Sequence, residues 1–236
     1  MTEFGPQATR ERLLAAAAQA IAEHGYASTT LSRVAASLGL TKGAYAYHFP
    51  TKAKIADALR DSFYELIREC HCGAKQIFPA GDMYTFVSFL ALMGHRVALD
   101  PIANGAVTVT FDLSTPRQHA AAMIQNMQDS LVPLIETARE TGQISSERSV
   151  EFQASSAIAM LLGSHFIGAR YSREEGEPRL RAIRAMLEML GAPAADEIAD
   201  KVLDRMMSDP HIGQPPVYQA GILTYPEQAT EDEAQQ

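Results

Sequence analysis

The chain has 236 residues and a net charge of −8 at pH 7, and 47% of its residues are hydrophobic. This hydrophobic content is ample for a buried core and excludes wholesale disorder. No apolar run approaches the roughly 20 residues that span a bilayer, and the N-terminus lacks the charged-then-apolar pattern of a secretory signal. With Cys70 and Cys72 as the only cysteines, we expect a reduced cytoplasmic protein without a stabilising disulfide or a membrane partner.

The charge is distributed unevenly along the chain. Residues 1–60 contain seven basic and four acidic residues, a charge of +3, so the remaining residues carry −11. A small basic end on an acidic body is typical of a two-part protein in which only one part meets phosphate. Ordinary charge fluctuation explains the same asymmetry equally well.

Apolar residues recur with helical period through the first part of the chain. The pattern predicts helices at 9–24, at about 31–38, at 41–49 and from 51 to about 71. Residues typical of helix ends mark these boundaries, with N-caps at Thr29 or Thr30, Thr41 and Thr51 and breaks at Gly25, Gly39 and Pro50. Four short capped helices within about sixty residues indicate a compact unit.

Longer helices are predicted beyond this unit, at 82–99, 101–113, 116–141, 147–171, 178–190 and 194–208. Residues 107–111 favour a strand by propensity, but helical patterns flank them and we expect a helix. The fold is therefore predicted to be all-α. We expect a three-helix helix-turn-helix DNA-binding domain at 7–67, a helical bundle for ligand binding and dimerisation at 68–208, and a mobile tail at 209–236.

The segment 29–52 carries the functional signal. Two short helices joined by a tight turn at Gly39 place the second across the first and expose a face as wide as a DNA major groove. Glycine and alanine in the second helix let its backbone approach the groove, and Lys52 begins the next helix, where it can meet a phosphate. The candidate DNA contacts are Thr30, Arg33, Thr41, Lys42, Gly43, Tyr45, Tyr47, His48 and Lys52.

This segment resembles the TetR family of bacterial repressors. The matching residues are Gly25-Tyr26, Thr29-Thr30, Ala35, Gly39, Thr41-Lys42-Gly43-Ala44, Tyr47-His48-Phe49 and Lys52. The resemblance covers about residues 9–60 and implies an all-helical homodimer, a palindromic double-stranded operator, and a small effector in the second domain that lowers DNA affinity. One departure is Tyr45 where an apolar residue is common, followed by Ala46 where a tyrosine is common. We expect Tyr45 to pack inward, which moves the contacts toward Tyr47 and His48.

A second resemblance concerns the effector. Residues 95–113 are similar to the Asp-Pro, Gly and Leu region of the γ-butyrolactone receptor branch, and Thr41-Lys42-Gly43-Ala44 also recurs there. This similarity implies a lactone signal, although the chain has no tryptophan to stack on it. The candidate effector residues are polar or methionine side chains in apolar helices: Met93, Thr108, Met123, Gln125, Met127, Ser156, Met160 and His165. Core filling accounts for the methionines equally well.

The family resemblance places the dimer interface on the helices near 147–171 and 178–190. Their apolar faces consist of Phe152, Ala159, Leu162 and Phe166 on the first and Ile183, Met186, Leu187 and Leu190 on the second. Burial against the chain's own core would produce the same pattern.

Metal and catalytic sites are not expected. Cys70-His71-Cys72, with His95 as a fourth ligand, cannot bind one ion from a continuous helix because residues i and i+2 point apart, and we expect these residues at a frayed helix end. No nucleophile elbow accompanies His24, His119 or His165 with Asp112 and Ser164, so no cofactor, metal or enzyme activity is predicted. Two alternatives remain: a helical carrier or enzyme that binds no operator, and a scaffold that uses the acidic body.

Overall fold

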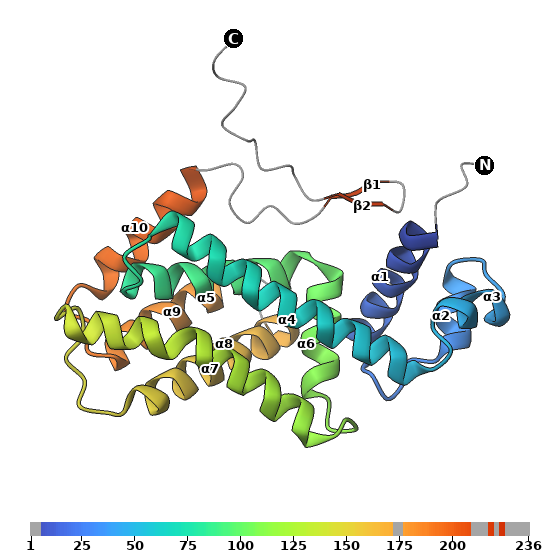
Figure 1. The fold of residues 1–236 in the computed structure, drawn as a ribbon, viewed down its shortest axis with the longest axis horizontal. Helices are drawn as coiled ribbons and strands as arrows, with labels where there is room; N and C mark the ends of the chain where they lie inside the picture. Colours follow the sequence, from blue (N-terminus) through green and yellow to red (C-terminus); the bar gives the residue numbers. More distant parts are fainter. Residues whose placement is uncertain (1–5, 172–176, 209–216, 220–221, 225–236) are drawn as a thin grey trace, which may run out of the picture.

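The structure is a computed structural model that describes residues 6–171, 177–208, 217–219 and 222–224. These residues form ten helices and a two-stranded hairpin (Figure 1). The elements are α1 (Pro6–His24), α2 (Leu31–Ser37), α3 (Lys42–His48), α4 (Lys52–Ile77), α5 (Met83–Leu99), α6 (Pro101–Phe111), α7 (Arg117–Glu140), α8 (Val150–Tyr171), α9 (Glu177–Met189), α10 (Ala195–Ser208), β1 (Val217–Gln219) and β2 (Ile222–Thr224). The all-α fold class and the order of helices predicted from periodicity are confirmed.

The short N-terminal helices begin and end where the local chemistry predicts. The hydroxyls of Thr30, Thr41 and Thr51 each accept a hydrogen bond from the backbone N–H three residues later, at 3.1–3.3 Å. Each hydroxyl thereby satisfies one of the free donors at a helix start. Gly25 and Gly39 follow α1 and α2 with φ of +80° and +67°, a backbone region that glycine adopts without strain.

The β-prone segment 107–111 is helical, as the flanking pattern predicts. It forms the second half of α6, which begins at Pro101. Asp100 is the N-cap of this helix, and its carboxylate accepts a hydrogen bond from the Ile102 N–H at 2.8 Å. Val107 and Val109 are fully buried, so tertiary packing and a capped start outweigh the strand propensity of the β-branched residues.

Helix α4 connects the N-terminal unit to the larger helical body (Figure 1). It continues to Ile77, so the prediction of an end near residue 71 and of fraying around Cys70 was wrong. Both cysteines lie inside the helix, with Cys70 buried and Cys72 exposed. The predicted domain boundary at 67/68 falls within this continuous helix, so one rigid element belongs to both parts of the chain.

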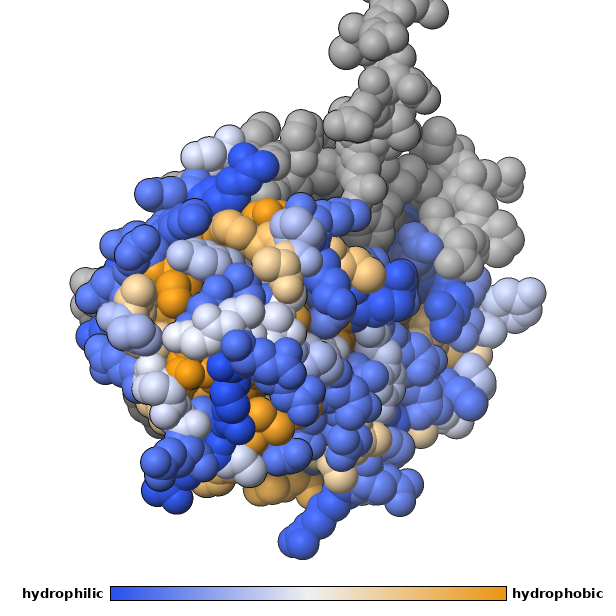
Figure 2. Space-filling model, turned by 60° about the vertical axis from the view of Figure 1, so that its left-hand side comes forward, coloured by the Kyte–Doolittle hydropathy of each residue, from blue (hydrophilic) through white to orange (hydrophobic). Residues whose placement is uncertain are grey.

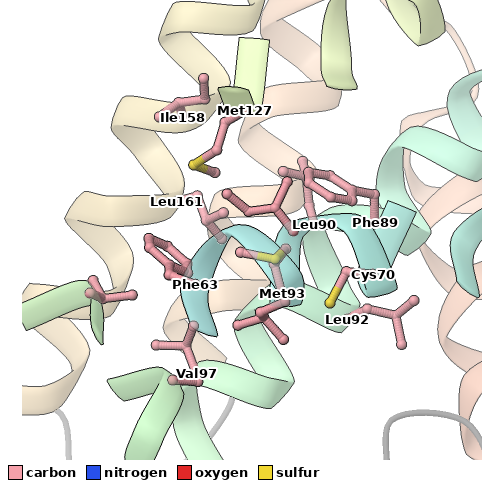
Figure 3. Packing of buried hydrophobic residues seen from close by; sticks show 14 of the residues in the cluster. Phe63, Cys70, Phe89, Leu90, Leu92, Met93, Val97, Met127, Ile158 and Leu161 are labelled. Atoms are coloured by element: carbon pink, nitrogen blue, oxygen red, sulfur yellow. The ribbon is translucent and has the colours of Figure 1, made fainter. Parts of the chain in front are cut away.

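The core of the helical body is apolar. Phe63 and Cys70 of α4, Phe89 and Met93 of α5 and Met127 of α7 are buried together there (Figure 3).

At the end of the molecule opposite α1–α3, hydrophilic residues surround several hydrophobic patches on the surface (Figure 2). Among the described helices, none is by itself long and apolar enough to cross a membrane, although α5 and α6 pass such a test as a pair bent by 100°.

The two parts of the chain meet closely where α6 crosses α1. A Cβ added at Gly105 would lie 2.6 Å from the Cα of Ala18 and 2.7 Å from its carbonyl oxygen. Real carbon atoms do not approach so closely. Glycine is therefore required at this position for the backbones of α1 and α6 to touch.

Two short strands lie within the predicted C-terminal tail, whose mobility stays a prediction. Val217–Gln219 and Ile222–Thr224 pair as antiparallel strands, and β2 contacts α1. Short hairpins gain stability by packing on another element, which the helical periodicity of the sequence does not reveal. The rest of 209–236 lies outside the described residues.

Candidate DNA interface and effector cavity

The crossing of α2 and α3 is fixed by a small buried seam. Val34 and Ala35 of α2 and Tyr45 of α3 are buried on the side that faces α1. Residues 38–41 join the two helices, with Gly39 providing the sharp turn. This arrangement leaves the opposite face of α3 free to enter a groove, as a recognition helix does.

The free face of α3 carries small, cationic and aromatic groups. Lys42, Gly43 and Ala44 are exposed, and the side chain of Tyr47 is 84% exposed. His48 is half-buried at the end of the helix, with its ring centroid 5.2 Å from that of Tyr47. A lysine and two helix N–H groups at one end and a projecting phenol at the other are suited to phosphate and base-edge contacts.

Tyr45 is not part of this face. Its side chain is fully buried, and its hydroxyl donates a hydrogen bond to the carbonyl oxygen of Leu13 at 3.1 Å. Burial raises the pKa of Tyr45 above its ordinary range, so the phenol stays protonated and remains a donor. The expectation that Tyr45 packs inward is confirmed. Its inclusion among the DNA contacts was wrong, because no atom of the side chain reaches the surface.

The remaining candidates flank α3. Thr30, Arg33 and Thr41 are exposed, and the two threonine hydroxyls already serve as helix caps. Such capped helix starts present free backbone N–H groups and a positive dipole end to a phosphate. Their contacts with DNA remain predictions.

Lys52 has partners within the protein. Its Nζ donates a hydrogen bond to the Ala27 carbonyl oxygen at 3.1 Å and lies 4.2 Å from the centroid of the Tyr26 ring. Burial lowers the pKa of Lys52, and the nearby Asp112 carboxylate opposes that shift. The lysine therefore fastens the start of α4 to the α1–α2 loop, and a phosphate contact by it remains a prediction.

Lys54 is a cation that was not among the predicted DNA contacts. Its side chain is 65% exposed in the first turn of α4, and its Nζ lies 3.6 Å from the Asp57 carboxylate. Residues two apart on a helix point in different directions. Lys52 and Lys54 therefore point in different directions, but their spacing does not tell which of them bonds the α1–α2 loop.

A small cavity lies between α4, α5, α6, α7 and α8. Its lining is apolar except for one histidine and consists of Phe63, Met93, Gly94, Val97, Val107, Met127, Leu161, Leu162 and His165. Figure 3 shows five of these side chains, from Phe63 to Leu161, gathered in one region of the core. The free volume is about 20 Å³, which is roughly the space that one water molecule needs.

The cavity brings together three of the eight predicted effector residues, Met93, Met127 and His165. Met123 is buried outside the cavity, and Thr108 and Met160 are half-buried outside its lining. The placement of Gln125 was wrong, because it is exposed and bonds Asp129. Ser156 is half-buried outside the lining, and its hydroxyl donates a hydrogen bond to the Phe152 carbonyl oxygen in its own helix. Phe63, Val97, Val107 and Leu161 were missed, because an apolar side chain carries no sequence signal that separates cavity from core.

The two predicted dimer faces differ in their exposure to solvent. On α8, Phe152 is 52% and Phe166 is 41% exposed, Ala159 is exposed and Leu162 is half-buried. On α9, the predicted face was wrong, because its four residues pack into the chain's own core: Ile183, Met186, Leu187 and Leu190. Met189, on the other side of α9, is 38% exposed.

Comparison with known proteins identifies the N-terminal domain. Residues 13–59, which contain α2 and α3, match the family model "Bacterial regulatory proteins, tetR family". The probable HTH-type transcriptional regulator ArpR of Pseudomonas putida is 27% identical over 169 residues, covering 69% of this chain and 80% of that protein.

Solved structures share the fold over most of the chain. A γ-butyrolactone receptor (ArpA-like protein) superposes with a TM-score of 0.67 at 15% identity, covering 84% of this chain and 98% of the receptor. The protein in a SmeT–triclosan complex superposes with a TM-score of 0.61 at 21% identity, covering 80% and 94%. The helix-turn-helix with its outward recognition helix is thus the domain that the family model describes: residues 13–59 form a DNA-binding domain of the TetR family, and the chain is similar over most of its length to transcriptional regulators.

Proposed function

We propose that the chain is a cytoplasmic homodimeric repressor that binds a palindromic operator and is released by a small molecule. The observation that carries this proposal is the division of α3 into two faces. Tyr45 anchors one face in the core, while Lys42, Gly43 and Tyr47 project from the other. A projecting phenol beside a lysine on the free face of the second motif helix supplies the groups that base-edge and phosphate contacts require.

Binding to DNA is tested most directly by a mobility shift with the DNA upstream of the chain's own gene. We expect nanomolar binding that survives competitor DNA and that Lys42→Ala with Tyr47→Ala reduces at least 100-fold, since two anchoring contacts are lost. Both side chains are exposed, so the domain should stay folded. Lys75→Ala, which removes an exposed cation at the far end of α4, is the matched control and should bind normally.

Absence of DNA binding in this assay would contradict the proposal. If the wild-type chain binds neither this DNA nor any duplex selected from genomic fragments, the repressor proposal is wrong. The carrier or enzyme alternative then becomes the better explanation of the helical body.

Dimerisation is supported by the exposed apolar face of α8. A single short recognition helix contacts only a few base pairs, so two copies about one DNA turn apart are needed for a specific site. We expect a dimer in sedimentation velocity that Phe152→Asp with Phe166→Asp converts to a monomer. Leu113→Asp is the control, because Leu113 is fully exposed in the loop after α6 and its replacement should leave the dimer intact. A doubly substituted chain that is still dimeric would place the interface elsewhere.

The effector is proposed to occupy the cavity around Met93, Met127 and His165. An apolar lining with one polar side chain favours an uncharged, mainly apolar molecule with a single polar group. The cavity must enlarge to admit one, and methionine side chains adapt readily to new shapes. A γ-butyrolactone is one candidate, because a γ-butyrolactone receptor shares the fold. Triclosan is another, because the protein of the SmeT–triclosan complex shares it too.

The effector proposal is tested by operator release. An inducer must bind the non-DNA conformation more tightly, and the size of its effect is limited by that difference. We expect one of these two compounds to release the operator from the wild-type chain, and Val107→Phe, which fills the cavity, to bind the operator but not respond. Operator affinity that is unchanged at saturation with both compounds would contradict this effector class.

A further inference from the structure

The C-terminal end of α6 touches the DNA-binding domain through one carboxylate. Asp112 directly follows α6, and its Oδ2 accepts a hydrogen bond from the backbone N–H of Tyr26 in the α1–α2 loop at 3.3 Å. Its Oδ1 accepts the Ser114 N–H at 2.8 Å and the Ser114 hydroxyl. The carboxylate is therefore held by its own loop on one side and bonds the other domain with its second oxygen.

The start of α4 joins the same contact. The Lys52 ammonium lies 4.2 Å from the centroid of the Tyr26 ring and donates to the Ala27 carbonyl oxygen, one residue further along the loop. Asp112 lies close enough to act on the charge of Lys52. Burial alone would raise the pKa of Asp112, but the hydrogen bonds from Ser114 and Tyr26 and the charge of Lys52 together bring it below its ordinary value. The carboxylate is thus ionised while it holds these partners.

The other end of this connection reaches the cavity. Val107 lines the cavity from α6, about 7.5 Å along the helix axis from Asp112 at 1.5 Å per residue. Between the cavity and the start of α6, Gly105 lies against the backbone of Ala18 in α1. Helix α6 is fixed where its backbone contacts α1, and its end contacts the α1–α2 loop through Asp112. Displacement of its cavity face therefore moves the contact with that loop.

We propose that Asp112 is a positioning residue, which together with Tyr26 and Lys52 forms an interdomain joint that sets the orientation of the recognition helix relative to the helical body. The joint holds the α1–α2 loop and the start of α4, the two segments that flank α2 and α3. Its role in operator binding rests on the repressor function proposed above, while its role in holding the α1–α2 loop does not.

Removing the negative charge of Asp112 and removing the joint should change operator affinity in opposite directions. Loss of a carboxylate from a chain of net charge −8 should strengthen attraction to DNA. A weaker operator complex after Asp112→Ala would therefore reflect lost positioning. Asp129→Ala, at an exposed carboxylate on α7, is the control for the charge change.

The first experiment needs no DNA. Hydrogen exchange of the full chain is measured for Asp112→Ala, Asp112→Asn and Asp129→Ala. We expect the Tyr26 amide to exchange at least fivefold faster in Asp112→Ala, an intermediate rate in Asp112→Asn because its side-chain oxygen still accepts the N–H, and a wild-type rate in Asp129→Ala. A wild-type exchange rate in Asp112→Ala would overturn the joint.

The second experiment measures operator affinity by fluorescence anisotropy with a duplex recovered from genomic fragments. We expect Asp112→Ala and Lys52→Met each to weaken binding about fivefold to tenfold. The doubly substituted chain should bind as tightly as the single variant with the lower affinity, because each substitution disrupts the same joint. Losses that multiply independently, or an Asp112→Ala affinity equal to that of Asp129→Ala, would overturn the positioning role. If the wild-type chain binds no duplex, the repressor function is contradicted instead. The hydrogen-exchange experiment then still tests whether Asp112 holds the α1–α2 loop.

Discussion

Replacing Gly105 with alanine tests the contact between α1 and α6 directly. The new Cβ would lie 2.6 Å from the Cα of Ala18 and 2.7 Å from both its Cβ and its carbonyl oxygen. Two of these three atoms belong to the backbone of a helix, so no side-chain rotation relieves the clash. Since carbon atoms pack at about 3.5 Å or more, the two helices must separate by about 1 Å.

The expected magnitude follows from two opposing effects. Overpacking in a close-packed interior costs typically about 1–3 kcal/mol, with the rigid backbone favouring the upper part of that range. Alanine gains about 1 kcal/mol over glycine in the interior of a helix. We therefore expect a net loss of about 1–2 kcal/mol in the free energy of unfolding, which for a chain of this size lowers Tm by about 2–8 °C.

The assay is thermal and urea unfolding followed by circular dichroism at one fixed protein concentration, because a dimer's Tm depends on concentration. Gly73→Ala is the matched control. Gly73 is also inside a helix, but its added Cβ would lie 3.5 Å from Leu92 Cδ1, an ordinary contact. We expect this variant to be as stable as wild type or slightly more so. If Gly105→Ala unfolds at the same temperature as Gly73→Ala, the two helices are not in backbone contact at this point.

Three further predictions concern buried or half-buried polar groups. Burial raises the pKa of the Cys70 thiol to about 12, so a thiol reagent should modify one cysteine of the native chain quickly, and Cys72→Ser should abolish that fast phase. Tyr45→Phe removes the buried hydrogen bond to Leu13 and should cost about 1 kcal/mol in urea unfolding while leaving operator affinity intact; a large loss of affinity would return Tyr45 to the DNA contacts. Burial and Lys75 lower the pKa of His71 below 6.5, so protonation favours unfolding and stability falls as the pH drops through the unfolded value of 6.5. Urea midpoints at pH 7 and pH 5 should therefore differ less in His71→Gln than in wild type, and equal differences would refute the shift.

The sequence predicts the helices well because their boundaries depend on local chemistry. Thr30, Thr41 and Thr51 act as caps through their own hydroxyls, and Gly25 and Gly39 adopt the positive φ that glycine allows. The same local signals delimit α2 and α3, so the recognition helix can be located without a structure. The end of α4 has such a signal too, because Pro79 follows the C-cap residue Phe78 and Gly81 adopts a positive φ. The prediction of an end near residue 71 did not use it and missed the last six residues of the helix.

The site within the helical body is less predictable, because it depends on which side of each helix faces inward. Helices α5 and α8 are apolar around much of their circumference, so the side facing the cavity has no distinctive pattern. For α9, the apolar stripe is visible in the sequence, but it fits a dimer interface and the chain's own core equally well. The contact of Asp112 with Tyr26 joins residues far apart in the sequence, and no spacing rule points to it.

The inward direction of Lys52 has a thermodynamic consequence for how the domain would hold DNA. A lysine that neutralises a phosphate releases close to one condensed counterion, and each such release steepens the fall of affinity with ionic strength. An ammonium that already bonds Ala27 and lies against Tyr26 releases no counterion unless it leaves these partners. The complex would then depend more on helix N-termini and hydroxyl groups than on mobile cations, so its affinity should decline less steeply with salt than the number of lysines in the domain suggests.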